Sequence, residues 1–401
     1  MQNTTIQKRR IEEIIKNDLK KKMVLLAGPR QCGKTTLSEK LLKEIPGSYY
    51  NWDIDLHKKR IRNSEFDLTS KLWVFDEVHK YKYWRNWLKG TYDLYKDKHK
   101  ILVTGSAKLD IYSRGGDSMQ GRYFFHRLHP FTLSEVMGIK AHDYMKKIND
   151  LEFETKLSGA KNLLEELLLF GGFPEPFCSK SLEEASRWRL TYGSRLIRED
   201  IRDLEKIFNL DKMEILYEHL PKTIGSVLSI NSLREDLEVN FRTVSNWIDI
   251  FERNYVCFRV FPFGSKKIKA VKKEKKLYFW DWAHVDKTPS RLENLVAMHL
   301  LRLCHWLSDV KGEKAELRYF RDIRGHEVDF IVLIKGEPWF ALEVKESEQD
   351  LDSNLKFFLE RTKIPYGFQI HLNGGKFTRL KDINEAKVHI LPAHVFLSML
   401  P

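Results

Sequence analysis

Cysteine is scarce in this chain, and the few cysteines stand far apart. The four in 401 residues are Cys32, Cys178, Cys257 and Cys304, and no two of them have the Cys-x-x-Cys spacing of zinc sites and redox motifs. This pattern argues against a disulfide framework and against a structural zinc site. It favours a reducing compartment, so we expect a cytoplasmic protein.

Long apolar runs are also missing. No stretch reaches the length that crosses a bilayer, and the first residues, MQNTTIQKRRIEEIIKNDLKKK, are polar with a helical pattern. We therefore expect neither export nor a membrane partner. A chain of 401 residues exceeds what one hydrophobic core usually organises, which favours two or three domains.

Acidic residues are too few to balance the basic ones. Lys and Arg number 69 against 56 for Asp and Glu, which gives a formal net charge of +13. Such a surplus favours contact with polyanions. DNA or RNA is therefore a candidate partner.

The most specific motif lies in LLAGPRQCGKTTLSEKLL, where Gly28, Gly33, Lys34 and Thr35 satisfy GxxxxGK[ST]. The glycines let backbone amides turn toward phosphate, the lysine meets the outer phosphates, and the threonine ligates Mg²⁺. An apolar strand precedes the loop and a helix follows it, so the phosphates would sit at a helix N-terminus. The sequence predicts a site for ATP and Mg²⁺. The residues expected to bind the nucleotide here are Gly28, Pro29, Arg30, Gln31, Cys32, Gly33, Lys34, Thr35 and Thr36.

An acidic element follows in KLWVFDEVHK, a buried strand that ends in Asp76 and Glu77. Asp76 is placed to hold the magnesium shell, and Glu77 to polarise an attacking water, which predicts hydrolysis rather than binding alone. A third apolar strand, HKILVTGSAKL, ends at Ser106, whose hydroxyl is a candidate sensor of the terminal phosphate. A simple strand-end turn is the alternative for Ser106.

The blocks GPRQCGKTTL, WVFDEVHK, LVTGSAKL, GRYFFHRLHPFTLSEV and GGFPEPF resemble a bacterial and archaeal group of AAA+-type ATPases whose C-terminal half is a domain of unknown function. The resemblance covers essentially the whole chain. It implies that Arg114 and Arg122 are candidates for contacting a γ-phosphate, including that of a neighbouring subunit in a homo-oligomer. The alternative for each is a solvated arginine in a loop.

In the middle of the chain, NLLEELLLFGGFPEPF predicts a helix that stops at two glycines. Residues 221–263 then predict two short helices and an apolar strand, an order that resembles a winged helix. Either the second helix reads DNA or the fold is a spacer that touches none. The lysine cluster GSKKIKAVKKEKK, which includes Lys266, Lys267, Lys272 and Lys273, is either a phosphate-backbone patch or a solvated loop.

The last third predicts two adjacent strands, GHEVDFIVLI and PWFALEVKE, joined by a KGEP hairpin that brings Asp329 opposite Glu343 and Lys345. This spacing resembles the PD-(D/E)xK nuclease fold. The resemblance implies that Asp329 and Glu343 hold Mg²⁺ or Mn²⁺, that Lys345 orients the attacking water, and that Glu293 is a further metal ligand. A cross-strand salt bridge, or a nuclease fold kept as an inert scaffold, is the alternative.

Together these patterns predict an α/β chain with a P-loop NTPase (AAA+-like) domain at 1–137, a helical region at 138–215, a winged-helix-like domain at 216–263 and a restriction-endonuclease-like α/β domain at 264–401. The expected function is ATP hydrolysis that controls a metal-dependent nuclease-like module. The alternative is an ATP-dependent switch or binding module whose nuclease-like part is inert.

Overall fold

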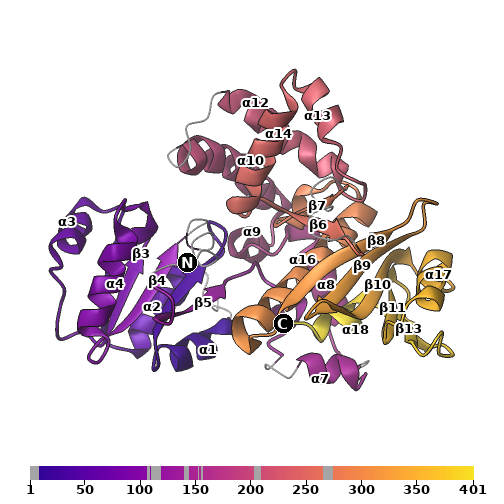
Figure 1. Cartoon of the computed structure of the whole chain (residues 1–401), viewed down its shortest axis with the longest axis horizontal. Coiled ribbons are helices and arrows are strands. Elements are labelled where there is room, and N and C mark those ends of the chain that lie inside the picture. The colour runs from indigo at the N-terminus through magenta and orange to yellow at the C-terminus, as the bar shows by residue number, and fades with distance from the viewer. Residues whose placement is uncertain are drawn as a thin grey trace. The chain divides into compact units, whose positions relative to one another are not determined.

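The computed structural model describes residues 9–105, 109, 119–139, 144–151, 153–154, 157–202, 209–264 and 274–401 (Figure 1). The chain divides into two compact units. We call Lys8–Pro130 with Arg253–Tyr255 the N-terminal unit, and the remainder, Phe131–Glu252 with Val256–Pro401, the C-terminal unit. Of the residues singled out in the sequence, Ser106, Arg114 and the lysines of 265–273 lie outside the described residues.

The N-terminal unit is built on a five-stranded parallel sheet with the strand order β2-β3-β4-β1-β5. The strands are β1 (Met23–Ala27), β2 (Gly47–Asn51), β3 (Leu72–Asp76), β4 (Lys100–Gly105) and β5 (Tyr123–Arg127). The helices are α1 (Ile11–Asp18), α2 (Lys34–Glu44), α3 (Asp55–Asn63), the short η1 (Val78–Lys80) and α4 (Trp84–Tyr95). The expected α/β class with a parallel sheet is confirmed.

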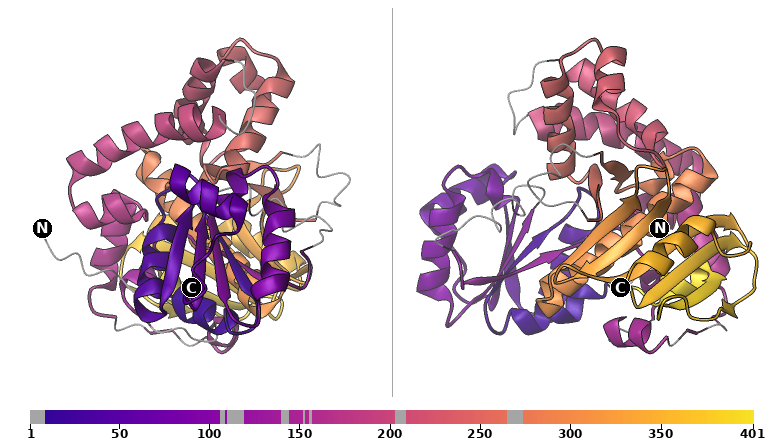
Figure 2. Two further views of the ribbon diagram at one scale, coloured as in Figure 1. Left: turned by 90° about the vertical axis from the view of Figure 1, so that its left-hand side faces the viewer. Right: turned by 45° about the vertical axis from the view of Figure 1, so that its right-hand side comes forward.

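The central strands of this sheet are apolar throughout because both of their faces are covered. Every residue of β1 and β3 is buried, and helices flank the sheet on both sides (Figure 2). Ala27 pairs with Gly105, and Asp76 pairs with Thr104, so the carboxyl ends of β1, β3 and β4 meet at one edge. The predicted phosphate-binding loop and the acidic residues therefore come to the same edge.

The C-terminal unit contains an eight-stranded mixed sheet with the order β12-β13-β11-β10-β9-β8-β6-β7. Its strands are β6 (Cys257–Pro262), β7 (Lys276–Phe279), β8 (Ala315–Arg321), β9 (Glu327–Ile334), β10 (Glu337–Ser347), β11 (Tyr366–Asn373), β12 (Thr378–Arg379) and β13 (Lys387–Pro392). The predicted hairpin between β9 and β10 is a two-residue turn, Lys335–Gly336, with positive φ at both positions, which suits the twist of paired strands.

Helices make up the rest of this unit. They are α6 (Leu133–Val136), α7 (Tyr144–Asn149), α8 (Ala160–Phe170), α9 (Pro174–Ser179), α10 (Leu182–Arg195), η2 (Leu196–Ile201), α12 (Leu210–His219), η3 (Leu220–Thr223), α13 (Ile230–Asp236), α14 (Phe241–Arg253), η4 (Trp282–His284), α16 (Thr288–Lys311), α17 (Ser353–Arg361) and α18 (Ala393–Ser398). Helix α17 packs its Leu355, Phe358 and Leu359 on the sheet in a core with Val328 and Ala341.

The predicted helix pair of the middle region is present as α13 and α14, and the apolar face of α14 is buried. The strand that follows does not form a separate small domain. β6 pairs antiparallel with β7 and parallel with β8, so both strands of this hairpin belong to the eight-stranded sheet. The predicted boundary at residue 264 falls between these paired strands, because the polar lysine-rich sequence of the hairpin connection reads like a linker. A winged-helix domain is not confirmed.

The GGFPEPF block marks a close packing contact. Helix α8 ends at Phe170, and Gly171 continues with φ 84°, which confirms the predicted helix stop. A Cβ on Gly172 would lie 2.4 Å from Cη2 of Trp282 and 2.7 Å from the Phe131 carbonyl oxygen. The Trp282 indole in turn donates to the Leu167 carbonyl at 2.6 Å. Glycine is required here because the backbone touches a buried tryptophan.

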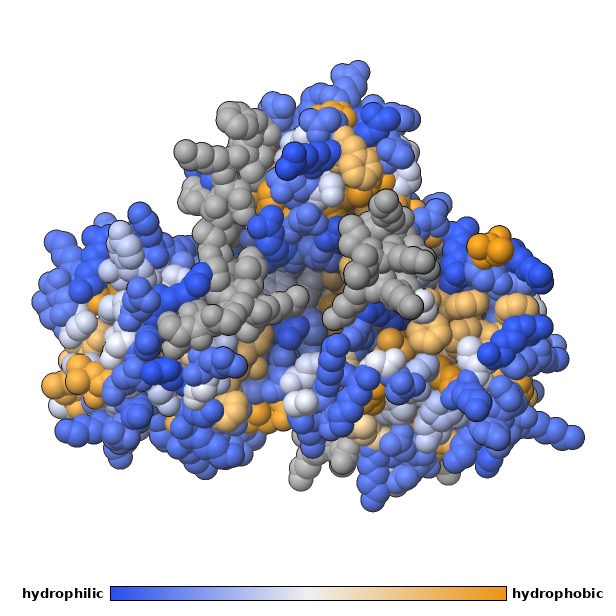
Figure 3. All heavy atoms as spheres, in the orientation of Figure 1, coloured by the Kyte–Doolittle hydropathy of each residue, from blue (hydrophilic) through white to orange (hydrophobic). Residues whose placement is uncertain are grey.

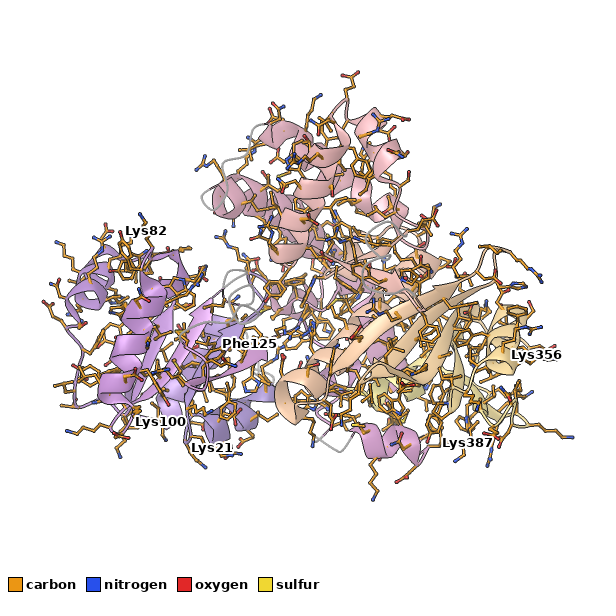
Figure 4. All side chains as sticks on the ribbon, viewed as in Figure 1. Lys21, Lys82, Lys100, Phe125, Lys356 and Lys387 are labelled. Carbon is orange, nitrogen blue, oxygen red and sulfur yellow. The ribbon has the colours of Figure 1, made fainter. Side chains whose placement is uncertain are left out.

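The surface of the described part is largely hydrophilic in the view of Figure 3, with apolar side chains scattered between charged ones. Lysines account for much of this character. In Figure 4 the labelled Lys21 and Lys82 of the N-terminal unit, and Lys356 and Lys387 of the C-terminal unit, point outward. Among the described residues, no helix is both long enough and apolar enough to cross a membrane.

Candidate functional site

The loop between β1 and α2 has the backbone that a phosphate-binding loop requires. Gly33, the residue before α2, has φ 97°, a left-handed conformation that side chains with a Cβ rarely adopt. A Cβ on Gly28 would lie 2.4 Å from the Leu128 carbonyl oxygen. Both glycines of the motif are therefore required by geometry, one by its torsion angle and the other by a close approach. The N-terminus of the 11-residue helix α2 opens directly behind the loop.

Lys34 is buried, and its ammonium donates to the carbonyl oxygens of Gly28 at 2.9 Å and Pro29 at 2.7 Å. The lysine thus folds back over its own loop and satisfies two acceptors there. The loop is also held from behind, because the Arg9 guanidinium donates to the carbonyl oxygens of Cys32, at 2.9 Å, and of His129. Cys32 itself is fully buried, with its thiol 3.6 Å from the Leu128 carbonyl oxygen.

The Asp76 carboxylate accepts hydrogen bonds from three hydroxyl groups at this edge. Its Oδ2 accepts from the Thr35 hydroxyl at 3.0 Å and from the Tyr49 hydroxyl at 2.5 Å, and its Oδ1 accepts from the Thr104 hydroxyl at 2.5 Å. Burial and the charge of Asp76 raise the pKa of Tyr49, which keeps the phenol protonated. Thr35 and Asp76, both predicted to hold Mg²⁺, therefore lie in direct contact. The threonine hydroxyl directs its proton to Asp76, so the lone pairs of its oxygen can face a cation.

Glu77 directly follows β3 and adopts φ 55°, an uncommon left-handed conformation for a residue with a side chain. Its carboxylate lies 3.4 Å from the Lys80 ammonium and 3.6 Å from Nε2 of His79. Burial raises the pKa of Glu77, against the opposing charges of Lys80 and Lys34. A carboxylate with a raised pKa beside the loop is suited to accept a proton from water.

The structure does not bring Arg122 to this edge. β5 pairs in parallel with β1, and Tyr123 lies beside Met23, at the strand end opposite to the loop that follows Ala27. Arg122 forms an ion pair there with Asp93, with the Nε–Oδ1 distance 2.7 Å. One subunit's Arg122 is thus separated from its own loop by the length of β1, about 13 Å. Contact with the γ-phosphate of a neighbouring subunit stays a prediction.

The comparison with known families concerns the N-terminal unit first. Residues 20–137 match a family described as an AAA domain. This part of the chain is therefore similar to AAA-type ATPase domains. Two further families, each described as a domain of unknown function, match residues 161–285 (DUF8612) and 290–393 (DUF4143) of the chain outside the ATPase domain. Neither description confirms a winged helix or a nuclease fold.

Two uncharacterised relatives align with most of this chain. An uncharacterised protein of Methanocaldococcus jannaschii is 26% identical over 91% of this chain and 84% of its own length. An uncharacterised protein of Mycobacterium tuberculosis is 23% identical over 81% of this chain and 70% of its own. The similarity therefore extends well beyond the ATPase domain into the C-terminal unit.

Solved structures give weaker likenesses. A signal-transduction ATPase (STAND) protein with a tetratricopeptide repeat sensor from Pyrococcus horikoshii aligns with 74% of this chain and 44% of its own, at 14% identity and a TM-score of 0.26. PCH-2 of C. elegans aligns with 61% of this chain and 65% of its own, at 13% identity and a TM-score of 0.25. These scores are too low to establish a shared fold.

The C-terminal unit also brings predicted residues together. The Val344 amide donates to Oδ2 of Asp329 at 2.9 Å, and the Asp329 amide lies 3.3 Å from Oε2 of Glu343, so the two carboxylates stand side by side on β9 and β10. Lys345 donates to Glu343 at 2.9 Å and to Asp352 at 2.7 Å. The predicted convergence of Asp329, Glu343 and Lys345 is present; their chemical roles stay predictions.

Glu293 reaches the same cluster through Lys276, the first residue of β7. The Lys276 side chain is only 1% exposed, and its ammonium lies 3.1 Å from Glu293, 2.6 Å from Glu327 and 3.6 Å from Asp329. The Glu293 oxygen that accepts from Lys276 also accepts from the Tyr278 hydroxyl at 2.6 Å. Glu293 is therefore occupied by an ammonium and a phenol, which does not suit its predicted role as a metal ligand.

Negative charge remains in excess in this cluster. Its five carboxylates, Glu293, Glu327, Asp329, Glu343 and Asp352, meet two lysines and, at the rim, Arg321. Burial raises the pKa of Asp329 to about 7, and burial with the neighbouring Asp329 raises the pKa of Glu343 well above its usual range. Two crowded carboxylates of this kind are typical of sites that take up a cation.

The fit to a metal is limited to those two carboxylates. Within the part of the chain that the structure describes, no group of three or more histidine, cysteine or carboxylate side chains is arranged to hold an ion. Mg²⁺ needs no such cage, because proteins often bind it through one or two carboxylates together with water and substrate phosphates. A magnesium site at Asp329 and Glu343 stays a prediction, and a closed protein-only Mn²⁺ site is not supported among the described residues.

Helix α14 is the helix that was predicted either to read DNA or to belong to a spacer. The Asn240 side chain accepts from the amide and hydroxyl of Thr243 and is used as a helix cap. Arg242 and Asn246 are exposed, and the acidic Asp249 pairs with Arg259 at 2.7 Å. Asp249 therefore does not repel a phosphate backbone as a free charge would. A nucleic-acid contact on this helix stays a prediction.

Two groups of site residues were not predicted from the sequence. Tyr49 and Thr104 hold Asp76 from the strands on either side, and neither was expected to contact it. Lys276 belongs to the lysine cluster that was predicted to be either a phosphate-backbone patch or a solvated loop. The sequence contains one indication of this role for Lys276. Lys276 and Tyr278 stand two residues apart in an apolar strand, so their side chains share one face.

Proposed function

We propose that this protein binds and hydrolyses ATP at the edge of the N-terminal sheet. The observation that carries the proposal is the direct contact between Thr35 of the loop and Asp76 of β3, with Glu77 next in the chain. The match of residues 20–137 to an AAA domain supports it. Lys34 binds the outer phosphates, Thr35 and Asp76 hold magnesium and its water, and Glu77 accepts the proton of the attacking water.

The same residues indicate how the site works. Lys34 leaves the carbonyl oxygens of Gly28 and Pro29 when phosphate oxygens offer a better, charged partner. Backbone amides of the loop and the N-terminus of α2 then meet the remaining phosphate charge. Bound Mg²⁺ supplies neutralisation of charge on the phosphate oxygens. Glu77, the next residue after Asp76, orients the attacking water.

Phosphate release from ATP in the presence of Mg²⁺, by the wild type and by Lys34→Ala, tests this function. The variant is expected to lose about 100- to 1,000-fold in kcat, as when one donor to developing charge is removed. Lys43→Ala, an exposed lysine of the same helix, is the matched control and should hydrolyse ATP normally. Equal rates in all three proteins, or none in the wild type, would refute the proposal.

A second activity is favoured by the paired carboxylates of the C-terminal unit. We infer that Asp329 and Glu343 hold Mg²⁺ against a phosphodiester and that Lys345, fixed between Glu343 and Asp352, orients the attacking water. The substrate would be DNA or RNA, in keeping with the net charge of +13. In this view ATP turnover in the N-terminal unit controls cleavage.

Cleavage of supercoiled plasmid, single-stranded DNA and structured RNA, with Mg²⁺ or Mn²⁺ and with or without ATP, tests the second activity. Lys345→Ala is expected to cut at least about 100-fold more slowly than the wild type. Lys356→Ala, an exposed lysine on α17, is the control and should cut normally. If the wild type cuts no substrate while it hydrolyses ATP, the C-terminal cluster is an inert scaffold.

A further inference from the structure

Tyr49 lies outside every motif, yet its side chain reaches the centre of the ATP site. It stands on β2, the outer strand next to β3, and its hydroxyl is 2.5 Å from Oδ2 of Asp76. The Thr35 hydroxyl approaches the same oxygen at 3.0 Å. A residue of β2 and a residue of the first turn of α2 thus converge on one carboxylate oxygen.

The direction of these hydrogen bonds follows from a chain of donors. The Asp53 amide donates to Oδ1 of Asn51 at 2.7 Å, which fixes that side chain with its nitrogen toward Tyr49. The Asn51 nitrogen then lies 3.2 Å from the Tyr49 oxygen and donates to it. Because the phenol oxygen accepts from Asn51, its one proton is directed to Asp76.

The other oxygen of Asp76 is equally constrained. Oδ1 accepts from the buried hydroxyl of Thr104 on β4 at 2.5 Å. The carboxylate is therefore held by hydroxyls from β2, β4 and α2 and has little freedom to rotate. Such outer partners commonly set the affinity of a metal site by 10- to 100-fold, because they fix the direction of the ligand's lone pairs.

We propose that Tyr49 is a positioning residue for magnesium, which holds Asp76 in the orientation that receives Mg²⁺ with ATP. This inference rests on the proposed ATPase function. It assigns Tyr49 no contact with the nucleotide or with the reacting water. The loss of its hydroxyl should therefore weaken magnesium binding without weakening the binding of ATP itself.

Tyr49→Phe removes only the hydroxyl and tests the proposal. Binding of a fluorescent ATP analogue in EDTA should match the wild type within about twofold. The Mg²⁺ concentration that gives half-maximal tightening of analogue binding, and half-maximal ATP hydrolysis, should rise about 10- to 100-fold. Saturating Mg²⁺ should restore most of kcat. Asn51→Ala should shift the magnesium requirement in the same direction by a smaller factor, because the phenol remains.

Tyr50→Phe is the matched control. Its hydroxyl accepts from the Asp67 amide at 2.9 Å and does not touch Asp76, so its magnesium requirement should equal that of the wild type. An unchanged requirement in Tyr49→Phe, or equal shifts in Tyr49→Phe and Tyr50→Phe, would overturn the inference. A wild type that binds the analogue but hydrolyses no ATP would refute the ATPase function alone. The magnesium dependence of analogue binding would still decide the role of Tyr49. A wild type that binds no nucleotide would refute both the ATPase function and the role of Tyr49.

Discussion

Glu77→Gln is expected to lower kcat for ATP hydrolysis by about 100- to 10,000-fold while ATP still binds. Glutamine keeps the shape of the side chain but cannot accept a proton from water. Glu77 has the properties of such a base, since burial raises its pKa and it directly follows the strand that ends in Asp76. Single-turnover phosphate release together with binding of a fluorescent ATP analogue measures both quantities.

The control for this variant is Glu39→Gln, an exposed glutamate of α2 that should leave kcat unchanged. Loss of ATP binding in Glu77→Gln would assign the residue to the nucleotide-binding contacts instead. A kcat within threefold of the wild type would remove Glu77 as the base. The carboxylate 3.4 Å from Lys80 would then be only a structural ion pair.

Lys276→Met is expected to lower the free energy of unfolding of the C-terminal unit by about 3–5 kcal/mol, the usual cost of removing one partner from a buried ion pair. Burial opposes the charged form of Lys276, but the surrounding acidic groups outweigh burial and raise the pKa of the ammonium. Methionine fills similar volume without charge. The carboxylates of Glu293, Glu327 and Asp329 would then face one another without their shared cation.

Urea unfolding, monitored by hydrogen exchange in peptides from β7 and β9, measures this loss of unfolding free energy within the C-terminal unit. Lys275→Met is the matched control, because its ammonium lies over the Phe261 ring at 4.8 Å and no ion pair of Lys275 is seen among the described residues. It should cost less than about 1 kcal/mol. A loss below 1 kcal/mol in Lys276→Met would mean that the cluster neutralises itself by taking up protons.

The parts of the site that the sequence predicted are those fixed by local pattern. An apolar strand, a glycine loop and a helix in direct succession allow few arrangements, and β1, the loop and α2 are present as expected. Asp329 and Glu343 came together because a two-residue turn fixes the register of β9 and β10. Both cases depend on residues close in the chain.

The parts that the sequence did not predict depend on neighbours distant in the chain. Tyr49 lies in GSYYN, a short polar strand whose position beside β3 follows only from the sheet order. Lys276 was placed in a phosphate-binding or solvated cluster because six other lysines stand in GSKKIKAVKKEKK, and only the fold shows that it begins a buried strand. Arg122 was placed near phosphate by resemblance, whereas the pairing of β5 with β1 carries it to the far strand ends.

The pairing of β6 with β7 also determines how the protein can be divided. A fragment cut at residue 264 would separate these two strands, and β6 also pairs with β8 on its other side. Each piece would present an open row of backbone amides and carbonyls, the kind of edge along which chains aggregate. Expression of the C-terminal unit should therefore keep α13, α14 and the whole hairpin on one polypeptide.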